Sequence, residues 1–350
     1  MFESEVEKAR NDLATDRLDM SFGEIMSMYN SEEIIIDPDF QRLFRWTPYQ
    51  QTRFIESLLL GIPIPPIFVA EDENGKWELV DGLQRLSTVL SFFGILKQLP
   101  DKNKWILLEG DLIENLKGYT IDNLPLKHQL SLKRAVCRIE IVKWNSAMDM
   151  RYELFNRLNT GGSTLTDQEI RNCIFRGISS DFNDFLKKIA SNSDFVEIIR
   201  PTEKQMQELY LEELVLRFAS LYDKRENIKE AMTKHMTEYM RDVVNNDSFD
   251  YSVGDLFIRV INVLKPLGWT IFRFNNSSFS TSLYDAITIG VADNIEYFEE
   301  QSENILAEKI ELLKENVDFR KLTGSAASSK TRVISRLKIA DEIFRAELYE

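Results

Sequence analysis

The chain has 350 residues, enough for about two or three domains, and its 43% hydrophobic and 11% aromatic residues can fill a sizeable core. With 43 basic and 57 acidic residues the net charge is −14. This balance excludes a histone-like coat for nucleic acid and confines any such contact to a local basic patch. Two scattered cysteines and two histidines exclude a disulfide framework and a four-ligand zinc site.

The sequence predicts neither a membrane span nor a targeting signal. Its first twenty residues are acidic and polar and lack the apolar run of a signal peptide. The most apolar stretch, Phe54–Ala70, contains Glu56 and three prolines, so it is too short and too broken to cross a bilayer. We therefore expect a cytoplasmic protein without a membrane partner.

The first half of the chain alternates strand and helix patterns. Thr47 and Pro48 are typical of a helix start, and Gly61 of its end. The pair Asn74-Gly75 predicts a hairpin turn. The expected strands are Glu33–Ile36, Ile67–Ala70, Trp77–Val80 and Ala135–Trp144, and the expected helices cover 48–60, the residues after 85, 148–158 and 166–176.

The second half of the chain is predicted to be helical throughout. Strand patterns vanish after about residue 180, and the composition changes between 160 and 180, which predicts two domains, 1–165 and 166–350. The overall class is therefore α+β, an α/β domain followed by an all-α domain. The expected helices of the second domain cover 203–222, 226–245, 252–265, 282–299, 302–315 and 328–347.

The most informative chemistry follows the second strand of the hairpin, in the segment Asp81–Thr88 (DGLQRLST). A glycine there allows a tight turn and close approach to a ligand, and the next helix N-terminus is an anion site. Arg85 suits phosphate oxygens, and the hydroxyls of Ser87 and Thr88 add donors. Asp81 suits a metal ion, a ribose hydroxyl or a clamp on Arg85, but a helix-capping Asp81 and an ion-paired Arg85 explain the pattern equally well.

A second cluster, Phe40–Trp46, interleaves Arg42 and Arg45 with aromatic residues. Such a mixture can bind phosphates and stack bases. It can equally cover a core with the aliphatic stems of the arginines.

A third cluster, Phe155–Gly162, carries Asn159 and Thr160 into a glycine turn, which is more polar than a helix C-cap requires. The surrounding stretch, residues 127–157, contains seven basic residues and three acidic ones. This stretch is either a nucleic-acid or nucleotide face or an ordinary solvated surface.

In this order, the three clusters resemble the GmrSD restriction endonuclease N-terminal family. The matching motifs are FQRLFRW, then FIESLLLGIPIPPIFVAEDENGKWELVDGLQRLSTVLSF, then FNRLNTGGSTLTDQEIRN. The resemblance is close over residues 20–178. It implies a ParB/sulfiredoxin-like fold for the first domain.

The resemblance also implies a nucleotide site. The D-G-Q-Q-R loop of the family corresponds to Asp81–Arg85, with Leu83 in place of the usual Gln. It implies that Asp81, Gln84 and Arg85 act in hydrolysis of GTP, CTP or ATP, with Mg²⁺ at Asp81. The implied nucleotide-binding residues are Gly82, Leu86, Ser87, Thr88, Arg42, Arg45, Asn159 and Thr160.

The family further implies anti-phage defence by a type IV restriction system that attacks modified phage DNA. Its nuclease is a histidine-rich HNH-type domain, whereas this sequence has no histidine after His235 and no H-N-H arrangement. We therefore expect a sensor or regulatory subunit whose partners are an HNH-type nuclease subunit, modified phage DNA and a second copy of the chain. Leu83 leaves an alternative open, a non-catalytic DNA-binding module with a degenerate nucleotide pocket. Cleavage of DNA by the chain itself is a third, less favoured hypothesis.

Overall fold

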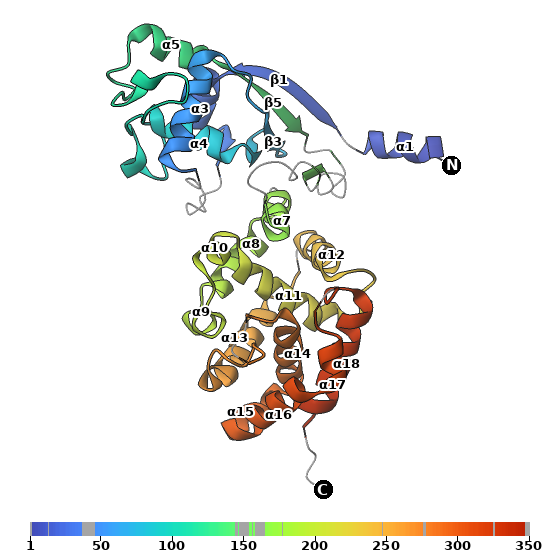
Figure 1. The fold of residues 1–350 in the computed structure, drawn as a ribbon. Coiled ribbons are helices and arrows are strands. Elements are labelled where there is room, and N and C mark those ends of the chain that lie inside the picture. The colour runs from blue at the N-terminus through green and yellow to red at the C-terminus, as the bar shows by residue number, and fades with distance from the viewer. Residues whose placement is uncertain are drawn as a thin grey trace. The chain divides into compact units, whose positions relative to one another are not determined.

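The structure is a computed structural model that describes residues 2–12, 14–36, 46–143, 146, 154–155, 157, 165–176, 178–246, 248–275, 278–324 and 326–346. The chain divides into two compact units, Met1–Thr164 and Leu165–Glu350, here named the sheet unit and the helical unit (Figure 1). A mixed sheet lies in the first, and the described part of the second is almost wholly helical. The predicted α+β class is therefore confirmed.

The described part of the sheet unit contains five strands, β1 (Thr15–Ser21), β2 (Ile34–Ile35), β3 (Ile67–Glu71), β4 (Trp77–Asp81) and β5 (Val136–Val142). Its helical segments are α1 (Phe2–Asn11), α2 (Phe22–Asn30), α3 (Pro48–Leu60), α4 (Leu83–Phe92), η2 (Pro100–Lys102), η3 (Glu114–Leu116) and α5 (Leu126–Arg134). The strand order is β1-β5-β3-β4-β2. Pairs β1–β5 and β3–β4 are antiparallel, and pairs β3–β5 and β2–β4 are parallel.

Local sequence determines the ends of α3 and the hairpin that follows. The side chain of Thr47 accepts from the N–H of Gln50 at 3.3 Å, and that of Gln50 accepts from the N–H of Thr47 at 2.9 Å, which makes a capping box. Gly61 ends α3 in the left-handed conformation (φ 69°). Gly75 (φ 78°) closes the turn between β3 and β4. The expected helix and hairpin are confirmed.

The sheet has one apolar and one charged face where β5 meets β1, because side chains alternate along a strand. Helices α3, α4 and α5 pack on the apolar side (Figure 1). On the other side Arg138 pairs with Asp19 at 3.0 Å, and Glu140 pairs with Arg17 at 3.0 Å. These ion pairs neutralise part of the basic stretch noted in the sequence. The core-facing residues of β5 are Cys137, Ile139 and Ile141.

Glu56 is buried in α3 (3% exposed) and holds a neighbouring loop. Its carboxylate accepts from the backbone N–H groups of Asp111 (3.1 Å), Leu112 (2.8 Å) and Ile113 (2.7 Å). We expect Glu56→Ala to destabilise the sheet unit by about 1–3 kcal/mol, because buried donors lose their acceptor. Hydrogen–deuterium exchange should become faster in the 107–116 segment. The matched control is the exposed Glu109, whose change to Ala should leave that exchange unaltered.

The helical unit is built around α11 and α14, of which ten and eleven residues are buried. Its long helices are α7 (Asp167–Arg176), α8 (Asp181–Ala190), α11 (Tyr210–Lys224), α12 (Met232–Val244), α13 (Ser252–Leu264), α14 (Thr281–Ala292), α16 (Glu303–Glu315) and α18 (Lys330–Phe344). Its short helices are α9 (Ser193–Ile199), α10 (Glu203–Gln207), η4 (Arg225–Asn227), η5 (Lys265–Leu267), α15 (Ile295–Glu300) and α17 (Val317–Lys321).

Three helices of this unit differ from the sequence prediction. The expected helix 203–222 is broken at Leu209, which is left-handed (φ 56°), and the hydroxyl of Thr166 donates to the carbonyl of Glu208 beside the break. The expected helix 282–299 is divided between α14 and α15, and the expected helix 226–245 begins only at Met232. Predicting each of these as one continuous helix was therefore wrong, since periodicity continues across a short break.

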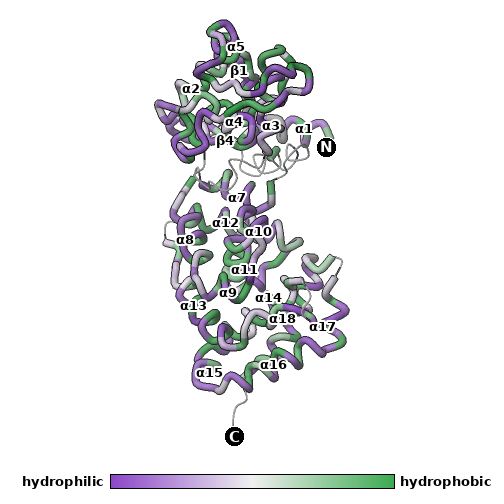
Figure 2. The backbone as a smooth tube through the Cα atoms, turned by 60° about the vertical axis from the view of Figure 1, so that its left-hand side comes forward, coloured by the Kyte–Doolittle hydropathy of each residue, from purple (hydrophilic) through white to green (hydrophobic). Residues whose placement is uncertain are grey.

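Figure 2 shows that hydrophobic and hydrophilic residues alternate at short intervals along the chain, as expected for amphipathic helices. None of the helices in the described ranges is both long enough and apolar enough to cross a bilayer. The predicted helix 148–158 lies largely outside the described residues.

Candidate functional site

The segment from Asp81 to Arg85 joins β4 to α4 through a turn that only glycine fits. Gly82 is the N-cap residue of α4 and has φ 102°. This backbone conformation is unfavourable for any residue that has a Cβ atom. A Cβ atom there would lie 2.8 Å from Cγ1 of Ile67 on β3. The backbone is thus pressed against the neighbouring strand, which fixes Asp81 and the first turn of α4 relative to the sheet.

Arg85 is held in place by two acceptors. Its Nη2 donates to Oδ2 of Asp81 at 2.6 Å, and its Nη1 donates to the carbonyl oxygen of Pro65 at 2.7 Å. Arg85 is 9% exposed, whereas the side chain of Asp81 is 45% exposed. Asp81 therefore clamps Arg85. It does not cap α4, because the N-cap residue is Gly82, which has no side chain to bond the first-turn N–H groups.

Gln84 connects this turn to the second sequence cluster. Its Oε1 accepts from the backbone N–H of Trp46 at 3.0 Å, and Gln84 is 8% exposed. The residue at the end of the FQRLFRW motif therefore lies beside the turn. The other expected binding residues of the second and third clusters, namely Arg42, Arg45, Asn159 and Thr160, lie outside the described residues.

The next three residues of α4 face the interior. Leu86 is 1% exposed in the core, and its N–H donates to the carbonyl of Gly82. The hydroxyl of Ser87 donates to the carbonyl of Leu83 at 2.7 Å. The side chain of Leu86 therefore packs in the core, and that of Ser87 is bonded to the backbone of α4. The buried Oγ1 of Thr88 has no hydrogen-bond partner in the described part of the chain, so its donor is unused.

The third cluster continues into α7, which begins with the expected capping box of Thr166 and Glu169. Arg171 is fully buried, and its guanidinium donates to Gln168 (2.9 Å) and to Glu213 (3.1 Å). The polar end of this motif is thus a buried network between α7 and α11. Sequence reasoning left its partner in α11 unidentified, because that residue is 42 positions away.

Cys137, the cysteine of the sheet unit, is unsuited to act as a nucleophile. Burial raises the pKa of the Cys137 thiol to about 11, and the nearby positive charge of Arg85 offsets this only in part. A thiol in this state stays protonated at neutral pH. Across the described ranges, no three His, Cys, Asp or Glu side chains form a group that could hold a metal ion.

Sequence reasoning missed two parts of the site. The carbonyl of Pro65 accepts from Arg85, and Ile67 closes the space above Gly82. Both come from the extended Ile62–Ile67 segment, whose prolines indicated its conformation but not its position. The antiparallel pairing of β3 with β4 sets Phe68 opposite Asp81 and so brings this segment to the turn before α4.

The domain is a mixed sheet in which β4 leads through an Asp-Gly-Leu-Gln-Arg turn into the N-terminus of α4. Residues 22–176 match the family model described as GmrSD restriction endonuclease, N-terminal domain. The match spans 155 of the 350 residues and identifies this part of the chain as a GmrSD-type N-terminal domain, which associates it with restriction systems. The matched segment begins at α2 and ends with α7.

No curated protein and no solved structure shows significant similarity to the chain. The ParB/sulfiredoxin-like relationship of the sheet unit accordingly stays a prediction.

Proposed function

We propose that this protein is the nucleotide-binding sensor subunit of a type IV restriction system, that it hydrolyses a nucleoside triphosphate, and that its target is modified phage DNA. The observation that carries the proposal is the turn of Asp81, Gly82 and Arg85 at the N-terminus of α4. The family match supports the association with restriction. The position of Arg85 supports the nucleotide, because Asp81 and the carbonyl of Pro65 hold its guanidinium close to the N-terminus of α4.

In this proposal the phosphates lie at the N-terminus of α4, where backbone N–H groups and the helix dipole favour anions. Arg85 supplies positive charge and Gln84 orients the attacking water. The half-exposed carboxylate of Asp81 fits Mg²⁺, since this ion is often bound by one or two carboxylates together with substrate phosphates. Bound Mg²⁺ would neutralise charge on the phosphates.

DNA cleavage is assigned in this proposal to an HNH-type nuclease subunit. His128 is an exposed residue of α5. His235 is buried in α12, its Nε2 lies 3.1 Å from the carbonyl oxygen of Ser220, and burial lowers its pKa. Their placements support the expectation that neither histidine is a nuclease residue.

The first test is Arg85→Ala. We expect nucleotide binding to weaken at least tenfold, because a hydrogen bond to a charged group contributes about 1.5–3 kcal/mol and the clamp on Asp81 is lost. Titration calorimetry with GTP, CTP and ATP, each with Mg²⁺, measures the change. Arg53 is the matched control, since it is exposed and pairs with Asp111 at 3.0 Å in the same unit. Equal affinities for wild type and Arg85→Ala would contradict the assignment.

The alternative is a DNA-binding module that binds nucleotide without turning it over. Leu83 favours it, because an apolar side chain packed partly against the core replaces the polar residue that the family has there. Phosphate release with each triphosphate, in the presence and absence of modified DNA, separates the two. Leu83→Gln should raise the rate if this residue limits hydrolysis.

A further inference from the structure

Three arginines gather around two aromatic rings on the helical unit. The Cζ atoms of Arg200 and Arg273 lie 4.6 and 4.9 Å from the centre of the Trp269 ring, and Cζ of Arg320 lies 5.7 Å from that of Phe274. We name these five residues the arginine–aromatic patch. Guanidinium groups at such distances stack favourably on the ring faces.

Among the described residues, the arginines of this patch have no carboxylate partner. Elsewhere in the helical unit, Arg217 and Arg259 pair with Asp285 and Glu299. Within the described residues, by contrast, no carboxylate lies within 4.0 Å of a guanidinium nitrogen of the patch. In a chain of net charge −14, this is a local excess of positive charge, and it lies outside the stretch of residues 127–157.

Arg273 is the fixed centre of the patch. It is 7% exposed, its Nη2 donates to the carbonyl of Ile199 at 2.6 Å, and its Nη1 donates to the carbonyl of Trp269. Burial and the positive charge of Arg200 both lower its pKa. Two guanidinium groups therefore share one ring and repel each other, and a bound anion would relieve that repulsion.

A pocket of about 300 Å³ opens beside Arg273 and Arg320. It also holds two acidic residues. Glu311 is neutralised by Lys314, whose Nζ lies 2.8 Å away, while Glu315 has no cationic partner in the described chain. Three arginines against one free carboxylate leave the surface positive. The larger groove of the unit has the opposite sign, since its lining includes Asp223, Asp250, Asp255 and Glu296.

We propose that the arginine–aromatic patch binds phosphate groups of the DNA backbone. Arg200 and Arg320 are exposed and contact the phosphodiester oxygens, while Trp269 and Phe274 hold the guanidinium planes in position. Arg273 fixes the aromatic platform and contributes charge from below the surface. This inference rests on the proposed action on DNA and gives the helical unit its part in it.

The test is the double change Arg200→Gln and Arg320→Gln in the full chain. Fluorescence anisotropy measures binding to a labelled duplex, with and without cytosine modification, over a series of salt concentrations. Loss of two phosphate contacts should reduce the slope of log K against log salt by about 1.8, since each contact contributes about 0.9. Affinity at low salt should fall at least tenfold, and it should fall equally for both duplexes because phosphates carry no sequence information.

The matched control is the double change Arg225→Gln and Arg259→Gln. It removes the same charge from the same unit, but these arginines pair with Asp293 at 3.0 Å and Glu299 at 2.6 Å. We expect the DNA affinity and the salt slope of this control to match wild type. If both double variants lose affinity equally, the effect is one of net charge and the patch assignment is overturned.

Two further measurements separate DNA from free nucleotide and this inference from the proposed function. Competition with GTP or inorganic phosphate should not displace DNA from the patch; displacement by millimolar GTP in both wild type and Arg85→Ala would assign the patch to mononucleotides instead. Calorimetric nucleotide binding should be unchanged in the Arg200/Arg320 variant. Failure of the folded wild-type chain to bind any duplex overturns this inference, whereas failure to bind nucleotide bears only on the turn at Asp81.

Discussion

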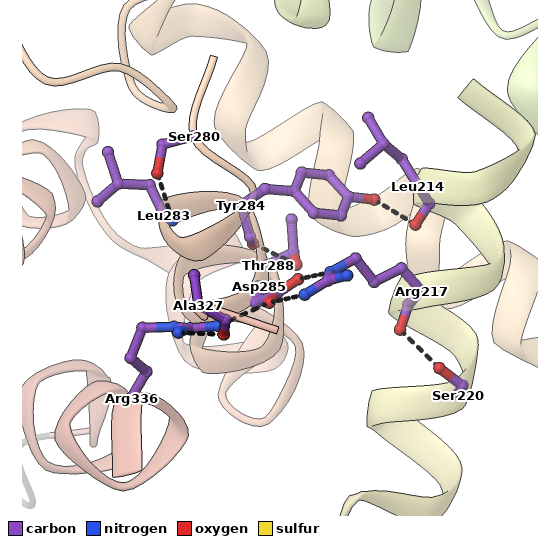
Figure 3. Close-up of polar contacts among 10 residues, drawn as sticks. All are labelled: Leu214, Arg217, Ser220, Ser280, Leu283, Tyr284, Asp285, Thr288, Ala327 and Arg336. Carbon is purple, nitrogen blue, oxygen red and sulfur yellow. Dashed lines mark hydrogen bonds and ion pairs between the residues drawn. The ribbon is translucent and has the colours of Figure 1, made fainter. Parts of the chain in front are cut away.

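Asp285→Ala should lower the free energy of unfolding of the helical unit by about 3–5 kcal/mol, the range found when one partner of a buried ion pair is removed. Asp285 lies in α14 and is 1% exposed. Its Oδ2 accepts from Nη2 of Arg217 in α11 at 2.7 Å and from Nη2 of Arg336 in α18 at 3.4 Å. Figure 3 shows this one carboxylate between two guanidinium groups that come from different helices.

The large effect follows from the charge balance of the cluster. Arg217 and Arg336 are themselves buried, at 5% and 1% exposed, so Asp285→Ala leaves two buried positive charges without the carboxylate that they share. Carbonyl oxygens of Leu322 (3.0 Å) and Ala327 (2.8 Å) accept from Nη1 of Arg336, but they carry no net charge. The hydrogen bond from Tyr284 to Leu214 does not involve the cluster, so it cannot compensate for the loss (Figure 3).

The change in the free energy of unfolding is measured by urea titration. Hydrogen exchange in α11, α14 and α18 assigns that change to the helical unit. Asp285→Asn keeps the shape and removes the charge, so it should lose most of the same stability. The control is Asp242→Ala, which breaks an exposed pair with Lys224 across α11 and α12. That pair should contribute about 1 kcal/mol or less. An Asp285→Ala effect no larger than that of the control would show that the buried charges are solvated in another way.

Such a cluster was beyond the sequence prediction, because its members are 68 and 51 positions apart. Apolar periodicity locates helices, but a charged residue on a predicted helix is ordinarily assigned to the surface. Arg217, Asp285 and Arg336 each contradict that assignment. Only the packing of α11 and of α18 on α14 shows that they share the interior.

Helix ends and turns were predicted correctly where the residues that determine them are adjacent in sequence. Thr47, Pro48 and Gly61 marked both ends of α3 correctly, and Asn74-Gly75 located the hairpin. The edge strand β1 was missed, because Thr15–Ser21 is largely exposed and polar and its pairing partner is β5, more than a hundred residues away. The two strands are joined by a backbone ladder of seven residue pairs, which no apolar pattern in β1 indicates.

The candidate site shows the same division. The glycine turn and the charged pair Asp81 and Arg85 were identified from the sequence, yet whether Arg85 pairs with Asp81 or faces a ligand alone stayed open. The structure shows the pair at 2.6 Å and adds the carbonyl of Pro65. That acceptor is a backbone atom twenty positions away, so no side-chain motif could reveal it.

Gly82→Ala should destabilise the sheet unit by about 2–5 kcal/mol and weaken nucleotide binding. Part of this is the left-handed backbone at φ 102°, which costs about 1–2 kcal/mol for a residue with a Cβ. The rest is overpacking, about 1–3 kcal/mol, because the new Cβ would lie 2.8 Å from Cγ1 and 3.3 Å from Cγ2 of Ile67, which is itself 1% exposed and cannot move into solvent. Nucleotide binding should weaken because a shifted turn moves Asp81 away from Arg85.

Gly61→Ala separates the two contributions. Gly61 is also left-handed (φ 69°), but nothing lies within 4 Å of the position that its Cβ would take, so this change carries the backbone strain without the contact. Chemical unfolding should place Gly82→Ala at least about 1 kcal/mol below Gly61→Ala. Combining Gly82→Ala with Ile67→Ala removes the two closest atoms that the new Cβ meets and leaves Nη2 of Arg85 at 3.4 Å, so the double variant should be less destabilised than the sum of the single changes. Strict additivity would mean that Gly82 is required for its backbone conformation alone, and that β3 plays no part in positioning Asp81 and Arg85.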